Sequence, residues 1–226
     1  MNPQLDLLHP YPFAKMATLL VDSVPASNYE TIKLGIGEPK HEPPAFVLKV
    51  LAENLNKVQN YPSTNGLPEL RQAIAQWLKQ RFRLTAIDAD SQIIPVMGTR
   101  EALFSFVQAA IDGSKVADSH YKPLVVMPNP FYQIYEGATL LAGAEPYFVD
   151  CHADNDFKGD YRSVPSEIWQ RTQVVFVCSP NNPTGAVFSE ADWQALIELS
   201  DQHDFIIASD ECYSELYFDK APVGLL

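Results

Sequence analysis

The sequence has few cysteines and few basic residues, and it contains no long hydrophobic run. Its three cysteines, Cys151, Cys178 and Cys212, do not have the spacing of a metal site. Cys178 lies in a predicted buried strand, so we expect a reduced, cytoplasmic protein. No apolar run approaches the ~20 residues of a membrane span, and the first residues show no signal-peptide pattern. We therefore expect a soluble protein with no membrane partner.

The charge balance and the glycine motifs exclude other classes of protein. Lys and Arg number 16 against 28 Asp and Glu, a net charge of -12, whereas nucleic-acid binding needs a basic surface. Neither the P-loop motif G-x-x-x-x-G-K nor the dinucleotide motif G-x-G-x-x-G occurs. His152 lies near three aspartates in the polar loop 151–163, but the spacing fits no calcium loop, so no metal is expected.

The most informative stretch runs from Val174 to Tyr217. Val174–Cys178 and Phe205–Ala208 are short apolar runs, as expected of strands buried on both faces of a parallel sheet. Between them, Ser189 followed by acidic residues predicts the start of a helix. In such a sheet, ligands bind outside the carboxyl ends of the strands.

Polar residues follow both of these strands, so we expect Asn182, Asp210 and Tyr213 to face one crevice. Further strands are predicted at 93–97, 122–127 and 146–150. The first is followed by Gly98-Thr99-Arg100 and a helix at 102–111, and a helix start of this kind suits an anion such as phosphate. After the second, Tyr132 emerges near the crevice, where it could pack or stack on a flat ring.

The N-terminal part is rich in proline. We expect residues 1–33 to form an extended arm with one short helix, docked on another surface such as a partner subunit. Gly37 lies in the run Leu34-Gly35-Ile36-Gly37. This run is either a turn at the end of a short strand or a segment whose missing side chains let a ligand approach the backbone closely. Segments 43–58 and 67–82 are predicted helices, the second with a core-facing apolar stripe, and Tyr61 lies in the loop between them.

These elements together resemble the fold type I, class I/II aminotransferases over nearly the whole chain. The motifs S-P-N-N-P-T-G (179–185) and S-D-E-C-Y (209–213) carry the resemblance most specifically. It implies an α/β fold, a three-layer αβα arrangement with a mostly parallel sheet, an N-terminal arm, and the cofactor pyridoxal 5'-phosphate (PLP). The implied domains are 1–40, the arm and a small-domain segment, and 41–226, an incomplete PLP-binding large domain.

The resemblance also implies a role for each matching residue. Asp210 would pair with the protonated pyridine nitrogen and so make the ring an electron sink. The other implied contacts are to the phosphate (Thr99, Arg100 and, across a homodimer interface, Tyr61), to the ring face (Tyr132), to the ring 3'-oxygen (Asn182 and Tyr213) and to the substrate (Gly37 and Asn182). The Asn182–Pro183 bond is expected to be cis.

Within the family, the N-terminal motifs look most like N-succinyl-diaminopimelate aminotransferases, which use 2-oxoglutarate as the 2-oxo acid in lysine synthesis. Alternatives are aminotransferases for aspartate, alanine, aromatic amino acids or LL-diaminopimelate. A β-lyase of the same fold and a non-catalytic, aminotransferase-like protein also stay open.

The chain departs from the family pattern in one respect. The family lysine that holds the cofactor covalently follows a further strand beyond the Asp210 position, and no lysine here has that context; Lys220 lies in a polar loop. We therefore expect a C-terminally truncated chain with no catalytic residue of its own, which is inactive alone and belongs to an active parent enzyme.

Overall fold

The computed structural model describes the whole chain except residues 25, 27, 31, 33, 39–40 and 116–120. Contacts divide the chain into two compact units, Met1–His9 with Pro68–Leu226, and Pro10–Leu67. Among the described residues, no helix is both long and apolar enough to cross a membrane.

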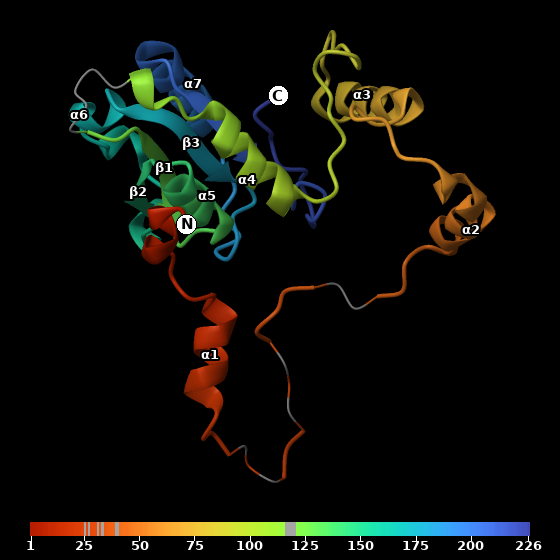
Figure 1. Ribbon diagram of the computed structural model, residues 1–226, viewed down its shortest axis with the longest axis horizontal. Coiled ribbons are helices and arrows are strands. Elements are labelled where there is room, and N and C mark those ends of the chain that lie inside the picture. The colour runs from red at the N-terminus through yellow and green to blue at the C-terminus, as the bar shows by residue number, and fades with distance from the viewer. Residues whose placement is uncertain (25, 27, 31, 33, 39–40, 116–120) are drawn as a thin grey trace. The chain divides into compact units, whose positions relative to one another are not determined.

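The larger unit is an α/β structure (Figure 1). Its elements in chain order are η1 (Pro3–Leu7), α3 (Pro68–Phe82), α4 (Thr99–Ala110), η3 (Gly113–Lys115), β1 (Leu124–Asn129), α5 (Ile134–Leu141), β2 (Glu145–Asp150), η4 (Ala153–Asn155), η5 (Tyr161–Ser163), α6 (Ser166–Trp169), β3 (Thr172–Cys178), α7 (Glu190–His203) and β4 (Ile206–Asp210). In the described residues, four strands form one parallel sheet in the order β2-β1-β3-β4, as the apolar runs predicted. The central strand β3 is mostly buried, but β4 is an edge strand in which Ile206 is 48% exposed, so the predicted burial on both faces is wrong for β4.

Helices cover both faces of the sheet, which confirms the predicted three-layer arrangement (Figure 1). Val174 and Phe176 of β3 point to one face and pack with residues of α4 and α5. Val175 and Val177 point to the other face and pack with residues of α6 and α7. The alternation follows from the strand repeat of two residues, and burial on both faces explains the apolar run.

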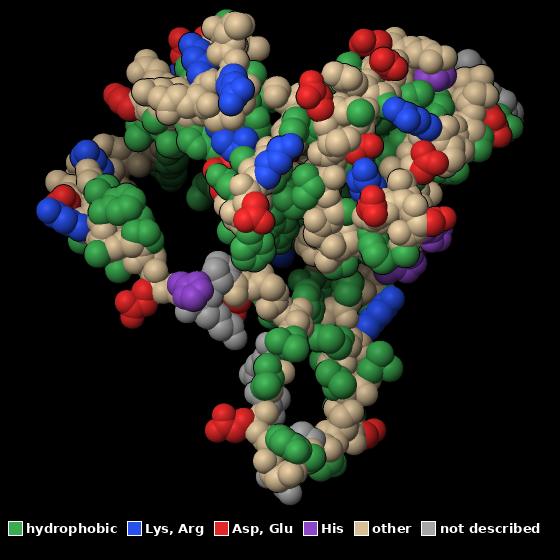
Figure 2. Space-filling model, turned by 180° about the vertical axis from the view of Figure 1, so that it is seen from behind, with side chains coloured by type: hydrophobic (Ala, Val, Ile, Leu, Met, Phe, Trp, Pro, Cys, Tyr) green, Lys and Arg blue, Asp and Glu red, His purple; other side chains and the backbone are tan. Residues whose placement is uncertain are grey.

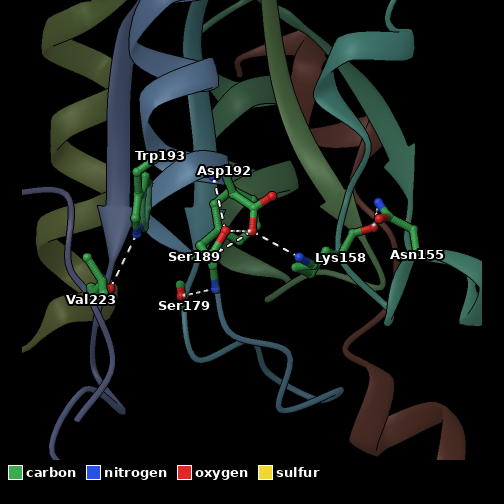
Figure 3. Close-up of polar contacts among 8 residues, drawn as sticks. Asn155, Lys158, Ser179, Ser189, Asp192, Trp193 and Val223 are labelled. Atoms are coloured by element: carbon green, nitrogen blue, oxygen red, sulfur yellow. Dashed lines mark hydrogen bonds and ion pairs between the residues drawn. The ribbon is translucent and has the colours of Figure 1, made fainter. Parts of the chain in front are cut away.

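The start of α7 follows the predicted capping pattern (Figure 3). The Ser189 hydroxyl accepts a hydrogen bond from the backbone N–H of Asp192, and the Asp192 carboxylate accepts one from the backbone N–H of Ser189 at 2.8 Å. Lys158 Nζ lies 2.9 Å from the same carboxylate. The polar loop that contains Lys158 is thereby joined to the first turn of α7.

The prediction of a strand at 93–97 is wrong. In the described residues, this segment has no regular secondary structure and pairs with none of the four strands. Ile94 and Met97 are 73% and 98% exposed. A strand requires a neighbouring strand to satisfy its backbone N–H and C=O groups, and composition alone does not supply that partner.

The helix predicted at 67–82 is confirmed as α3, but its apolar stripe is only partly covered, with Ile74, Leu78 and Phe82 half-buried and the other three residues exposed. Leu70 and Trp77 are 47% and 43% exposed, whereas Arg71 and Ala75 are the buried residues of the helix. Helical periodicity therefore predicted the element and not the surface that it buries.

The smaller unit contains α1 (Pro12–Leu20), α2 (Ala45–Glu53) and η2 (Leu55–Gln59). None of the described residues in these three elements is buried. Large hydrophobic side chains lie at its surface (Figure 2), including Leu19 at 82% and Phe46 at 69% exposure. The helix predicted between residues 13 and 21 is present as α1, and the docking of the arm on a partner stays a prediction. The predicted boundary after residue 40 also stays a prediction, because it separates functional domains and the two units reflect contacts alone.

Candidate functional site

The site is built at the carboxyl ends of β3 and β4. Cys178 and Asp210 are the last residues of these strands and are paired in the parallel register. Asp210 lies two residues after Ala208, which packs on the α4 and α5 side of the sheet. Because side chains two apart in a strand share a face, Asp210 also points to that side, where α4 and α5 begin.

Asp210 is buried, with 8% exposure, and two donors hold its carboxylate. The Tyr135 hydroxyl donates to Oδ2 at 2.6 Å, and the backbone N–H of Cys212 lies 3.3 Å from Oδ1. Tyr135 was not among the predicted site residues. No local sequence signal marks Tyr135, because its role rests on a hydrogen bond to a residue 75 positions away.

The predicted anion site is the beginning of α4. Gly98 has φ +133°, a conformation that residues with a side chain rarely adopt, so the backbone requires glycine; a Cβ there would also lie 2.5 Å from Oε2 at the flexible end of Glu101. Ala102 is the first residue of the helix whose N–H bonds back to Gly98, at 3.1 Å. A first helical turn of this kind presents its N–H groups and the positive end of the dipole outward.

The start of α4 lies against the loop that follows Asp210. The Cys212 Sγ is 3.4 Å from the Thr99 hydroxyl. The structure therefore brings the predicted phosphate site and the predicted pyridine partner together at one end of the sheet.

Tyr132 is also part of this group. Arg100 Nε donates to the Tyr132 hydroxyl at 2.8 Å, and the Tyr132 ring meets the Tyr135 ring edge-on with centroids 5.9 Å apart. The hydroxyl is thus tied to the first turn of α4 while the ring is fixed against α5. The Tyr132 ring is therefore held in place before any flat ligand ring stacks on it between Tyr132 and the end of the sheet.

The turn after β3 contains the S-P-N-N-P-T-G motif. The Ser179–Pro180 and Asn182–Pro183 bonds are both cis, which confirms the prediction for Asn182. The Ser179 hydroxyl (Figure 3) accepts from the backbone N–H of Phe188 at 3.0 Å. The backbone N–H of Ser179 donates to the Asp210 carbonyl at 3.1 Å. These bonds fix both ends of the turn to the sheet.

The electrostatics of the site are dominated by burial. Burial raises the pKa of the Cys178 thiol to about 12, and the Asp210 charge adds to this shift. Burial also raises the pKa of Tyr213, with smaller contributions from Cys178, Cys212, Asp210 and Tyr132. These groups therefore stay protonated at neutral pH, and Asp210 lies among neutral hydrogen-bond donors.

Two predicted residues lie in the other unit. Gly37 and Tyr61 belong to Pro10–Leu67, where Tyr61 is fully exposed and a Cβ at Gly37 would meet no atom within 4 Å. Their proposed contacts stay predictions. No group of three or more His, Cys, Asp or Glu side chains within the described part of the chain could hold a metal ion.

The donor set fits PLP. A buried carboxylate suits a protonated pyridine nitrogen, a helix start that requires glycine suits a phosphate, and a fixed tyrosine suits the ring face. The tyrosine and asparagine that follow the two strands are side chains able to bond a phenolic oxygen.

Comparison with known proteins gives a consistent result. The family model for aminotransferase class I and II matches residues 29–225. An LL-diaminopimelate aminotransferase of Desulforudis audaxviator (strain MP104C) is 32% identical over 94% of this chain and 52% of its own length, and one of Nitratidesulfovibrio vulgaris (strain DP4) is 33% identical over 96% and 54%. The chain therefore spans about half the length of the curated relatives it matches.

Two solved structures extend the comparison. An aminotransferase from Neisseria meningitidis Z2491 is 50% identical with a TM-score of 0.91, and the match covers 100% of this chain and 56% of that one. Aminotransferase AspB from Helicobacter pylori 26695 is 34% identical with a TM-score of 0.84, covering 96% and 55%. Both matches support the fold over almost the whole of this chain.

Proposed function

The chain belongs to the class I and II aminotransferases, a family of PLP-dependent enzymes, and from this we propose that its whole protein transfers an amino group between an amino acid and a 2-oxo acid. The activity is a proposal because the chain spans 52% of the length of one curated relative and 54% of another.

One observation carries the proposal. The buried carboxylate of Asp210 and the start of α4 lie at the same end of the sheet, linked through the 3.4 Å contact between Cys212 and Thr99. A negative side chain for the ring nitrogen and an anion site for the phosphate are thereby separated by one short loop.

The resemblance to the family supports the roles of the remaining residues. We assign the phosphate to Thr99 and Arg100, the ring face to Tyr132, and the 3'-oxygen to Asn182 and Tyr213. When bound, PLP supplies an electron-withdrawing ring that labilises bonds at the substrate α-carbon. Asp210 keeps the ring nitrogen protonated, and Tyr132 orients the ring.

Two roles are assigned to the smaller unit. Gly37, with Asn182, would lie against the substrate, and Tyr61 would reach the phosphate of a neighbouring subunit in a homodimer. The exposed hydrophobic side chains of α1 and α2 support association with further protein surface. Tyr61→Phe in the full-length protein should weaken PLP binding, whereas Tyr29→Phe should not; equal affinities would remove Tyr61 from the site.

For the substrate, we propose a diaminopimelate-type amino donor in lysine synthesis, acting in the cytoplasm. The N-terminal motifs favour N-succinyl-LL-2,6-diaminopimelate with 2-oxoglutarate as acceptor. The names of the curated relatives favour LL-diaminopimelate as the second candidate. Measuring kcat/KM of the full-length protein for the two donors distinguishes these candidates. The same measurement with aspartate, alanine and aromatic amino acids tests the remaining alternatives.

The 226-residue chain alone should bind PLP without attaching it covalently, because no lysine has the expected context. Equilibrium dialysis with PLP, followed by borohydride reduction and mass spectrometry, tests this. Reversible binding that Asp210→Ala abolishes supports the assigned site. A borohydride-stable adduct at a specific lysine, together with turnover of an amino donor, would show that the chain carries its own catalytic lysine. Turnover by the full-length protein separates an aminotransferase from a β-lyase or a non-catalytic protein.

A further inference from the structure

Tyr135 lies at the centre of the site although no motif drew attention to it. Its side chain has 0% exposure, and its ring stacks on Phe176 with centroids 4.2 Å apart and planes within 7°. Phe176 belongs to the central strand β3, so the ring of Tyr135 is fixed against the most buried part of the sheet. A side chain held in this way has little freedom to move its hydroxyl.

The hydroxyl of Tyr135 is a donor to Asp210. The distance from the hydroxyl to Oδ2 is 2.6 Å, which is short and typical of a bond to a charged acceptor. Burial raises the pKa of Tyr135, and the nearby Cys178 and Asp210 raise it further, so the hydroxyl keeps its proton.

The second oxygen of Asp210 is held from another direction. The backbone N–H of Cys212 approaches Oδ1 at 3.3 Å, so the plane of the carboxylate is fixed by one donor from α5 and one from the following loop. An ionised carboxylate has about four acceptor positions on its two oxygens, and these two donors leave positions for a third.

We propose that Tyr135 is a positioning residue that orients the Asp210 carboxylate toward the pyridine nitrogen of the bound cofactor. The inference rests on the proposed function. Tyr135 also touches the Tyr132 ring edge-on, so the residue that aims the carboxylate supports the ring that stacks on the cofactor. One side chain thus sets the geometry of two cofactor contacts without touching the cofactor itself.

The test uses the 226-residue chain and pyridoxamine 5'-phosphate, which needs no covalent lysine. Tyr135→Phe removes the hydroxyl and keeps the ring. Tyr161→Phe is the matched control, because Tyr161 is also buried, with 5% exposure, and its hydroxyl donates to the Phe176 carbonyl at 2.9 Å, not to Asp210. Affinity is measured for pyridoxamine 5'-phosphate and for its 1-deaza analogue, in which a carbon replaces the ring nitrogen.

We expect Tyr135→Phe to bind pyridoxamine 5'-phosphate about tenfold more weakly than the wild-type chain, the fold-change that corresponds to one hydrogen bond to a charged group. Its affinity for the 1-deaza analogue should change less than twofold, and Tyr161→Phe should bind both ligands like the wild type. A purely structural role would weaken both ligands equally, and that result, or no loss with either ligand, would overturn the proposal.

A ligand-free measurement keeps the two proposals separate. Proton NMR of the free chain should show a slowly exchanging hydroxyl proton between Tyr135 and Asp210, present in the wild type and Tyr161→Phe, and absent in Tyr135→Phe and in Asp210→Ala, which removes the acceptor. If the wild-type chain binds neither ligand, the proposed cofactor site is refuted. The hydrogen bond between Tyr135 and Asp210 is then tested by this hydroxyl proton alone. Absence of this proton from the wild type, or its persistence in Asp210→Ala, would overturn the positioning role.

Discussion

Lys158 Nζ lies 2.9 Å from the Asp192 carboxylate that also caps α7 (Figure 3). One carboxylate therefore serves both the helix start and the polar loop 151–163. Because α7 covers one face of the sheet and leads into β4, this contact supports the strand that carries Asp210.

The first prediction concerns the pH dependence of this contact. Burial opposes ionisation of Asp192, but the bonds from Lys158 and Ser189 outweigh it and hold the pKa of this carboxyl below its usual range. A pKa that is lower in the folded state gives stability that is present at neutral pH and is lost as the pH falls through the folded-state pKa. Asp192→Asn should lower the free energy of unfolding by about 1 kcal/mol at pH 7, with a difference that shrinks below about pH 4.

Urea unfolding at several pH values measures this difference. Asp219→Asn, in an exposed loop near the C-terminus, is the control and should leave the free energy of unfolding unchanged. A destabilisation by Asp192→Asn that does not depend on pH would contradict the electrostatic account.

The second prediction compares two glycines. Gly98→Ala places a side chain at φ +133° and against Glu101, so it should destabilise the start of α4 by about 1–3 kcal/mol. Gly137→Ala lies inside α5, where a Cβ meets no atom within 4 Å, and should be neutral or stabilise by about 0.5–1 kcal/mol. Thermal unfolding of both variants gives the comparison, and equal effects would show that the conformation of Gly98 is not required.

The third prediction concerns the thiols. The three cysteines are free, and Cys212 is exposed whereas Cys151 and Cys178 are buried. Because the thiolate is the reactive form and burial raises the pKa of Cys178 to about 12, iodoacetamide at pH 8 should modify Cys212 first and Cys178 very slowly. Mass spectrometry of the digested protein gives the order of modification. All three should react at similar rates in denaturant, and rapid labelling of folded Cys178 would show that the end of β3 opens to solvent.

The fourth prediction concerns Arg81, which joins α3 to the C-terminal segment. Its guanidinium donates to Glu215 at 2.7 Å and to the carbonyls of Ser214 and Pro222 at 3.2 and 3.0 Å. Arg81→Met leaves these carbonyls without this donor and should cost about 1–3 kcal/mol, with faster amide exchange in residues 211–226. Exposed Arg162→Met is the control, and unchanged exchange in Arg81→Met would mean that other contacts hold this segment.

Part of this structure could be predicted from the sequence because it depends on neighbouring residues. The apolar runs before Cys178 and Asp210 predicted β3 and β4, and Ser189 with Asp192 predicted the start of α7. Asp210 and the start of α4 were also predicted to lie at one end of the sheet, and they do, although the strand predicted before α4 is not found among the described residues.

The rest depends on partners distant in sequence. The segment 93–97 has a strand composition, but within the described residues no strand lies beside it. The apolar stripe of α3 predicted that another part of the chain packs on this helix, and the described residues bury the stripe only in part. Tyr135 could not be predicted from the sequence, because it acts through a hydrogen bond to a residue 75 positions away and nothing in its local pattern separates it from a packing tyrosine.

The pairing of Cys178 with Asp210 limits how related sequences can change in length. Deleting one residue from β4 would turn the carboxylate to the α7 side of the sheet, away from Tyr135, without altering any other residue type. Insertions and deletions should therefore be tolerated in the loop 151–163 and rejected within the five residues Ile206–Asp210. A library of single-codon deletions across both segments would record this difference as a map of permitted lengths.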